Sequence, residues 1–199
     1  EVGLCALGVG PDEVDGPGLV LACPGVEGAH IDADGALELY DGALRLRKAD
    51  NTLAYDHFNT SQYLELIGEH VEPWSYMKFP FIKSMGVDNG WYRVGPLARM
   101  NTVSFIDTPR ANAARDELMA ANNGQRTHAI LANHWARMIE VLHCVEKITE
   151  LLHDPDLQGT DLRATGDRRE EGIGVIEAPR GNLIHHYKVD ENDQVTYCN

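Results

Sequence analysis

The sequence predicts an α+β fold that is predominantly helical, and three stretches carry this prediction. The first is one long amphipathic helix at about residues 126–153. The second is a small antiparallel meander within residues 30–56, and the third is a C-terminal hairpin within residues 172–198. At 199 residues the chain is long enough for a sizeable core. No internal repeat divides it, so we expect residues 1–199 to form a single unit.

The N-terminal part of the chain alternates short apolar runs with turn residues. Residues 1–30 are rich in Gly, Pro, Val and Leu, which indicates loops around one or two short strands. Within residues 30–56, turn-forming segments separate apolar side chains that recur with a period of two, at Leu37, Leu39, Leu44 and Leu46. This pattern predicts the antiparallel meander.

A short helix and an irregular segment are expected next. Thr60 or Ser61 can cap a short helix by accepting an early backbone N–H. Residues 72–92 contain two prolines and two glycines among aromatic side chains, so they cannot form a regular helix. We expect an ordered, largely buried loop there, followed by a short helix after Pro96.

The two longest helices are predicted in the second half of the chain. One should run from Thr108 as N-cap to Gly124, with a proline in its first position. The other covers residues 126–153, where a mainly apolar stripe steps by four and three positions through Leu131, Trp135, Met138, Leu142, Val145, Thr149 and Leu152. A polar loop at 163–172 then leads into the final strands.

Composition and charge exclude several classes of partner. The formal net charge is −14, and the 17 Lys and Arg residues are scattered, which argues against nucleic acid and anionic membranes. The apolar runs are too short to cross a bilayer, so we expect no membrane partner. Four cysteines without a CxxC pair indicate free thiols in a reducing compartment, and hence a cytoplasmic protein. The unusual start and the abrupt end predict a segment of a larger protein.

Most candidate motifs are incomplete. Residues 32–38 start like a calcium loop but lack the third ligand, so we expect a turn. Residues 8–13 lack the third glycine of a dinucleotide-binding loop. No HExxH motif occurs, and consecutive residues such as His143 and Cys144 point to different faces of a helix, so we assign no metal ligand and no Cys–His dyad. Surface or interface roles are expected for the helix histidines His128, His134, His143 and His153.

The stretch Glu177-Ala178-Pro179-Arg180-Gly181 is the strongest local candidate for a site. Proline fixes one φ angle and glycine permits a backbone path closed to other residues, so Arg180 between them would have little freedom. A guanidinium held in this way suits an anion or a polarised small ligand such as cyanide. The alternative is an ordinary turn in which Arg180 pairs with Glu177 or another carboxylate, and the residues alone leave both interpretations open.

Five segments, read together in order, resemble the large subunit of nickel–iron hydrogenases. They are ELYDGALRLRKADN at 38–51, GEHVEPWSYMKFPFIKSMG at 68–86, WYRVGPLARMN at 91–101, HWARMIEVLHCVE at 134–146 and EGIGVIEAPRGNLIHHYKVDEN at 171–192. The likeness is greatest to the cytoplasmic branch coupled to NAD, deazaflavin or heterodisulfide reduction.

The resemblance covers residues 30–198, whereas residues 1–29 have no match. The EAPRG and GPLAR motifs together are its most specific part, and the pair His185-His186 is typical of the cytoplasmic branch. No chemical role is assigned to these two histidines.

The resemblance also implies a metal centre, NiFe(CN)2(CO), in the full-length protein. In that family two CxxC motifs bind the metals; neither is present here, so this chain would supply no metal ligand, bind no cofactor alone and be inactive alone. Ala178 and Pro179 would line the pocket of the diatomic ligands, and Arg180 would be the catalytic residue over the open metal position. Arg93 and Arg99 would give structural support.

The partners implied by the resemblance are H2 as substrate and an iron–sulfur small subunit that removes electrons. Cut free, the segment should expose apolar surfaces and self-associate. One alternative is a non-catalytic, hydrogenase-like scaffold or docking subunit that has lost its metal cysteines. A further alternative is an unrelated acidic binding module.

Overall fold

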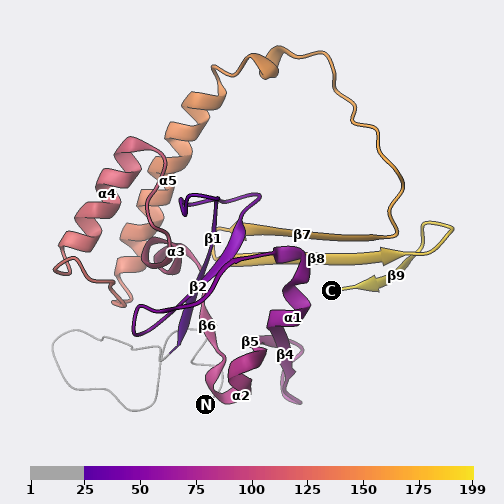
Figure 1. The fold of residues 1–199 in the computed structure, drawn as a ribbon, viewed down its shortest axis with the longest axis horizontal. Helices are drawn as coiled ribbons and strands as arrows, with labels where there is room; N and C mark the ends of the chain where they lie inside the picture. Colours follow the sequence, from indigo (N-terminus) through magenta and orange to yellow (C-terminus); the bar gives the residue numbers. More distant parts are fainter. Residues whose placement is uncertain (1–24) are drawn as a thin grey trace.

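Three β-sheets and a group of helices make up the computed structural model, which describes residues 25–199 (Figure 1). The α+β class is confirmed, but within these residues the strands cover more of the chain than the α-helices, so "predominantly helical" overstates the helix content. The strands are β1 (Val26–Ile31), β2 (Ala43–Lys48), β3 (Leu53–Phe58), β4 (Ile67–Val71), β5 (Lys78–Ile82), β6 (Tyr92–Arg93), β7 (Glu171–Ala178), β8 (Gly181–Val189) and β9 (Val195–Cys198). The helices are α1 (Tyr63–Leu66), α2 (Gly86–Asn89), α3 (Pro96–Thr102), α4 (Pro109–Ala120) and α5 (Ala132–Leu151).

The predicted meander is confirmed as the antiparallel strands β1, β2 and β3, and β6 adds to it in parallel beside β1. Leu37 and Leu39 lie outside these strands, and Leu37 makes only an isolated bridge with Ile31. The cause is the turn after β1, where the carboxylate of Asp32 accepts the backbone N–H of Ala36 at 2.8 Å. The expected turn at residues 32–38 is therefore present.

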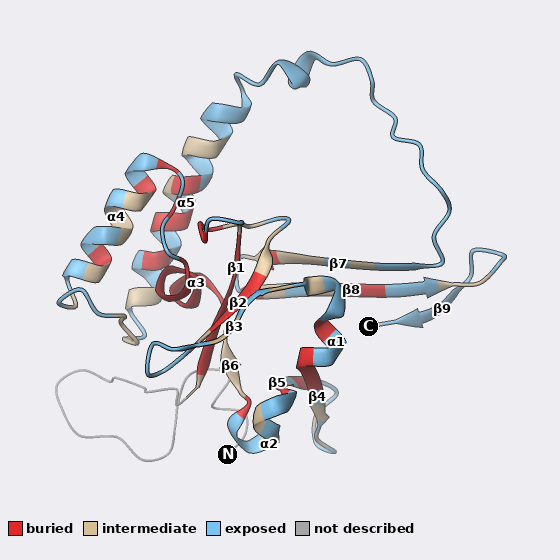
Figure 2. Ribbon diagram, in the orientation of Figure 1, coloured by how far each residue is buried: buried red, intermediate tan, exposed pale blue. Residues whose placement is uncertain are grey.

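The larger core lies where α3, α4 and α5 meet β1. Every residue of α3 is buried, and Figure 2 shows this helix as one continuous buried segment. The contributing side chains include Ile31, Leu97, Met100, Val103, Leu118 and Ile139. A second apolar cluster joins β2 to the short α1 and to the C-terminal hairpin, through Leu46, Tyr63, Ile82, Ile173 and Ile184 among others.

The predicted long helix is present as α5, but it covers Ala132–Leu151 rather than residues 126–153. Residues 126–131 are irregular because their polar groups bond elsewhere. The guanidinium of Arg126 donates to the carbonyls of Lys48 and Ala49 at 2.7 and 2.9 Å, and the carbonyl of Thr127 accepts from an asparagine side chain. The 20 residues of α5 span about 30 Å. No helix within residues 25–199 is long and apolar enough to span a bilayer.

Most of the predicted stripe of α5 faces away from the core, although Leu142 packs against it. Met138, Val145 and Leu152 are 63%, 54% and 68% exposed. The buried side of the helix carries Ala136, Ile139, Glu140 and His143. In Figure 1 the C-terminal half of α5 rises beyond α4, and an exposed connection over residues 152–170 leads from it to β7.

Thr108 precedes α4 as predicted, but α4 ends at Ala120 rather than Gly124. The side chain of Thr108 does not cap the helix; its hydroxyl bonds Nδ1 of His143 at 2.9 Å. Instead, the carboxylate of Glu146 on α5 accepts the first backbone N–H groups of α4. The short helix after β3 is likewise capped by a different residue from those expected, because Asn59 accepts the N–H of Ser61 at 2.9 Å.

Residues 72–92 are not the buried loop that we expected. They contain β5, which pairs with β4 in a two-stranded sheet, followed by a 3₁₀ turn and α2. Pro80 is accommodated because a two-stranded sheet leaves one side of each strand without a ladder. Trp74, Tyr76 and Met77 are 64%, 100% and 56% exposed, so the segment presents aromatic side chains outward.

The C-terminal hairpin is confirmed as β7, β8 and β9 in antiparallel order, with the second turn around residues 190–194. The polar loop before β7 is also confirmed, since residues 163–170 are exposed and irregular. The loop expected at residues 8–13, Cys5 and Cys23 lie outside the described residues.

Candidate functional site

The EAPRG motif forms the tip of the β7–β8 hairpin, where Pro179 and Arg180 are the two turn residues. This tip packs against the residues that begin the GPLAR motif. A Cβ atom on Gly181 would come within 2.5 Å of Val94 Cγ2, and Gly95, with a φ of +96°, would place a Cβ 2.9 Å from the carbonyl oxygen of Arg180. Both glycines are therefore required for the close contact of two motifs that lie far apart in the sequence.

The buried side chain of Arg99, in the GPLAR motif, binds the EAPRG motif. Nη1 of Arg99 donates to Glu177 Oε2 at 2.8 Å and to the carbonyl of Ala178 at 3.1 Å. The other side of the guanidinium binds both carboxylate oxygens of Glu140 on α5. The second oxygen of Glu177 accepts the backbone N–H of His30 at 2.8 Å. Arg99 and Glu177 together thus connect α3, α5, β1 and β7 at the hairpin tip.

The charges of this cluster are almost completely desolvated. The side chains of Arg99 and Glu177 are 1% and 0% exposed. Burial opposes the charge of Arg99, but hydrogen bonds and charges from Glu140 and Glu177 outweigh it and raise the pKa of the guanidinium. Burial also raises the pKa of Glu140, and Arg99 offsets only part of that effect. If Arg99 were removed, neither Glu140 nor Glu177 would keep a cation at a similarly short distance within the described residues.

Arg180 is in the opposite situation. It is exposed, and within residues 25–199 its side chain makes no hydrogen bond or ion pair. The alternative in which Arg180 pairs with Glu177 is wrong, because Glu177 is ion-paired with Arg99 instead. The structure brings Ala178, Pro179 and Arg180 together at the hairpin tip, with Ala178 partly buried and the other two exposed.

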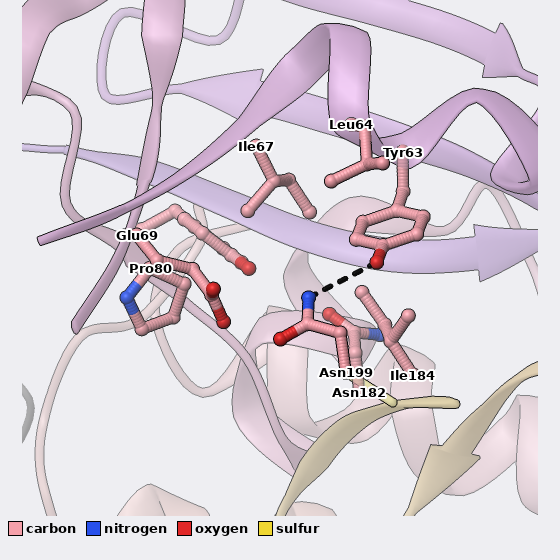
Figure 3. A pocket seen from close by; sticks show the side chains of 9 residues that line it. Tyr63, Leu64, Ile67, Glu69, Pro80, Asn182, Ile184 and Asn199 are labelled. Carbon is pink, nitrogen blue, oxygen red and sulfur yellow. Dashed lines mark hydrogen bonds between the residues drawn. The ribbon is translucent and has the colours of Figure 1, made fainter. Parts of the chain in front are cut away.

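The two adjacent histidines point to opposite faces of β8. His186 is buried, its Nε2 lies 2.8 Å from Glu171 Oε1, and its Nδ1 lies 3.2 Å from the hydroxyl of Tyr63. His185 is exposed and stacks on Tyr187. Figure 3 shows the Tyr63 hydroxyl at the edge of a pocket of about 170 Å³, where it accepts a hydrogen bond from Asn199 at 3.1 Å. Burial raises the pKa of Tyr63.

A second buried cluster surrounds Glu27 on β1. Its carboxylate accepts hydrogen bonds from Arg93, from Asn101 at 3.0 Å and from Arg126 at 2.9 Å. Burial works to raise the pKa of Glu27, but the hydrogen bond with His128 and the charge of Arg93 lower it overall. Arg93 and Arg99 therefore both stabilise the fold around the motif, in agreement with the supporting role expected for them.

Sequence reasoning missed the acidic partners of these arginines. Glu140 lies on the buried face of α5, and the available signal was an acidic residue within a helix that is mostly apolar. His143 is a satisfied interface residue as predicted, because it bonds Thr108. Cys144 next to it is exposed, which confirms that the two do not form a dyad.

Within residues 25–199, no group of three or more His, Cys, Asp or Glu side chains could hold a metal ion. Cys144 and Cys198 are free and exposed. The donor chemistry at the hairpin tip is instead that of a guanidinium on a stiff turn beside the small side chains of Ala178 and Pro179.

Comparisons with known proteins identify the family. The nickel-dependent hydrogenase family matches residues 26–198. The chain is 41% identical over 179 residues to the NAD-reducing hydrogenase HoxS subunit beta of Cupriavidus necator, covering 88% of this chain and 36% of that protein. It is 41% identical over 178 residues to an iron–sulfur subunit of the F420-non-reducing hydrogenase of Archaeoglobus profundus, covering 85% of this chain and 36% of that protein.

A solved structure shows the same fold. The crystal structure of an NAD+-reducing [NiFe]-hydrogenase in the H2-reduced state superposes with a TM-score of 0.84 at 48% sequence identity, over 88% of this chain and 39% of the matched chain. The chain thus spans little more than a third of the length of these relatives. The family match over residues 26–198 shows that this chain belongs to the nickel-dependent hydrogenase family.

Proposed function

We propose that this chain is the central portion of the catalytic large subunit of a nickel–iron hydrogenase, which oxidises H2 reversibly to protons and electrons. The observation that carries the proposal is Arg180, exposed and without an ion-pair partner in the described residues, on a hairpin tip that two motifs of this family build together. The matched relatives are named as NAD-reducing and F420-non-reducing hydrogenase subunits, which supports the same branch for this protein.

The metal centre would be held by residues outside this segment. A NiFe(CN)2(CO) centre needs thiolate ligands, and residues 25–199 offer no cluster that could supply them. What these residues do offer fits the surroundings of such a centre: a permanent cation and small apolar side chains on a turn with little backbone freedom. When bound, the centre would supply the polarisation of H2.

Each residue of the hairpin tip would then have a separate role beside the centre. Ala178 and Pro179 would wall the pocket of the diatomic ligands and exclude water. Arg180 would direct its guanidinium N–H groups at a cyanide and at the site of H2 cleavage, where a fixed charge acts strongly because the surroundings are dry. Arg99 would hold the carbonyl of Ala178 and thereby the geometry of the tip.

The partners in this proposal are H2 and an iron–sulfur small subunit that accepts the electrons, in the cytoplasm. The matched relatives are named as subunits of hydrogenases, which supports an assembly of more than one chain. The segment alone would bind no metal centre and would be inactive.

Intact mass together with nickel and iron content, measured on the native protein purified from its source, tests the proposal. A polypeptide well above 22.0 kDa with stoichiometric nickel supports it. A native subunit without nickel would contradict it and favour the scaffold or docking subunit. In the nickel-loaded complex, R180K should lower H2 turnover about 100-fold or more at unchanged nickel content, since Lys cannot present the same fork of donors.

A further inference from the structure

We propose that one water molecule binds beneath the hairpin tip, between His30 of β1 and Asn182 of β8, and that these two side chains position Arg180 through it. The positioning role rests on the proposed function, whereas the water site itself does not. No sequence motif indicates this pair, because the two residues lie far apart along the chain and only the fold brings them to one cavity.

Each of these side chains buries a polar atom that has no partner. Nδ1 of His30 and Nδ2 of Asn182 make no hydrogen bond within residues 25–199. His30 is 1% exposed, and its Nδ1 lies 3.9 Å from Glu177 Oε1, which is too far for a direct hydrogen bond. Buried polar atoms are costly to leave without a partner, and in folded proteins those that no protein group reaches are usually satisfied by ordered water.

The two residues line one small cavity of about 10 Å³. Thr60 and Tyr63 also line it, and its other lining side chains are apolar. The cavity adjoins the open pocket drawn in Figure 3, but none of its own lining residues is exposed, whereas Leu64, Glu69 and Pro80 of that pocket are. A cavity of about 10–15 Å³ holds a single water molecule, which needs about two to four polar partners. Its size and lining therefore suit one water and exclude a larger ligand.

The water site lies on the same face of the hairpin as the Arg99 cluster. Asn182 is directly opposite Glu177 in the antiparallel register of β8 and β7, so the two side chains point to the same face. Glu177 binds Arg99 and accepts the backbone N–H of His30 at 2.8 Å. The water would thus join β8 to β1, the strand that already holds β7.

The water would complete the support of the turn that carries Arg180. The strand before the turn is fixed by Arg99, which donates to Glu177 and to the carbonyl of Ala178. Asn182 lies in the strand after the turn, two residues beyond Arg180, and its Nδ2 gains a partner only through the water. With both strands anchored, Arg180 keeps one position. Misplacing a catalytic group by about 1 Å can slow a reaction about 100-fold, so such an anchor affects turnover.

A crystal structure of the full-length subunit tests the water site directly. One ordered water should lie within about 3.2 Å of His30 Nδ1 and of the side-chain amide of Asn182. Urea unfolding of the metal-free subunit gives a second measure. N182L and H30L should each lower the urea midpoint, and the double variant should lower it by clearly less than the sum, because either change alone already removes one partner of the water. A direct hydrogen bond between His30 and Asn182, a cavity without water or additive shifts would overturn the water site.

The positioning role is tested in the nickel-loaded complex. N182L should lower kcat for H2 oxidation about tenfold at unchanged nickel content, while KM for H2 stays within about twofold, because Arg180 acts at the cleavage step. N182T, whose hydroxyl can still bind the water, should recover most of the turnover. L183N is the matched control and should keep wild-type turnover, because Leu183 is the next residue on the outer face of β8 and is 42% exposed.

Wild-type turnover in N182L, or equal losses in N182L and L183N, would overturn the positioning role. A loss that appears in KM rather than kcat, or that N182T does not recover, would do the same. A wild-type complex without nickel or H2 turnover would instead overturn the proposed function. The crystal structure and the urea experiment would still decide on the water site, because neither needs the metal.

Discussion

Replacing Arg99 by Met removes the one cation from a buried cluster of two carboxylates. The guanidinium makes four hydrogen bonds, two with Glu140, one with Glu177 and one with the carbonyl of Ala178. Methionine replaces the aliphatic stem of arginine but not the guanidinium, so the substitution removes the charge and the four hydrogen bonds and leaves some space unfilled. The perturbation is therefore electrostatic, with a smaller loss of packing.

The size of the effect follows from what is left behind. Glu177 is fully buried and would keep only the backbone N–H of His30 as a partner. Glu140, whose pKa burial already raises, would lose its main counter-charge, and its pKa would rise further. Removing one member of a buried ion pair costs about 3–5 kcal/mol, and we expect R99M to lower the free energy of unfolding by that amount.

Urea unfolding of the metal-free full-length subunit, followed by tryptophan fluorescence, measures this loss. The matched control is R180M, which should change the free energy of unfolding by less than about 0.5 kcal/mol because Arg180 is exposed. The double variant R99M/E140L should recover part of the loss, since it removes a stranded carboxylate as well. A loss below about 1 kcal/mol in R99M, or equal losses in R99M and R180M, would refute the structural role of Arg99.

Three further predictions follow from the described residues. E27Q should lower the free energy of unfolding by about 3 kcal/mol, because it leaves the surrounding arginines without their carboxylate, and thermal unfolding of the subunit would detect it. Burial lowers the pKa of His30 and of His143, so both are neutral in the fold and protonate more readily when unfolded. Stability should then fall as pH drops below about 6.5, and H143Q should flatten that part of the curve, while an unchanged curve in H143Q would contradict the assignment. The isolated chain should self-associate through the exposed stripe of α5, and M138E should shift it towards monomer in sedimentation experiments; a strictly monomeric wild-type chain would count against this.

Local patterns predicted the elements whose cause is local. The meander follows from a period of two with turn residues between strands, and α4 and α5 follow from apolar spacing and a proline at a helix start. The start of α5 could not be predicted because Arg126 is held by carbonyl groups of β2 and the turn after it, which only the folded sheet brings near. Which side of α5 is buried could not be predicted either, because both sides of the helix carry apolar side chains. Only the contact with α3 and α4 determines that the side with Ile139 is buried.

In the candidate site too, local features could be predicted from the sequence and long-range contacts could not. The order Pro179, Arg180, Gly181 predicts a stiff turn, and the structure has a turn there. That Glu177 binds Arg99 rather than Arg180 could not be read from the sequence, because adjacency along the chain favours the wrong pair. In a strand successive side chains point to opposite faces, so a residue at the hairpin tip cannot easily reach back to the inward-facing Glu177.

The two arginines of the motifs owe their different roles to what surrounds them. Arg99 uses its N–H donors for four hydrogen bonds within the protein, so it has little capacity left for a ligand. Its charge is already balanced by two carboxylates, and it acts by fixing the backbone of Ala178. Arg180 leaves its donors free in the described residues, and its position is set by Pro179, Gly181 and the close contact with Gly95 rather than by an ion pair. A guanidinium positioned by its backbone keeps all its donors for an incoming ligand, whereas one positioned by carboxylates does not. The buried network around Arg99 is thus the means by which this fold can hold Arg180 in place without neutralising it.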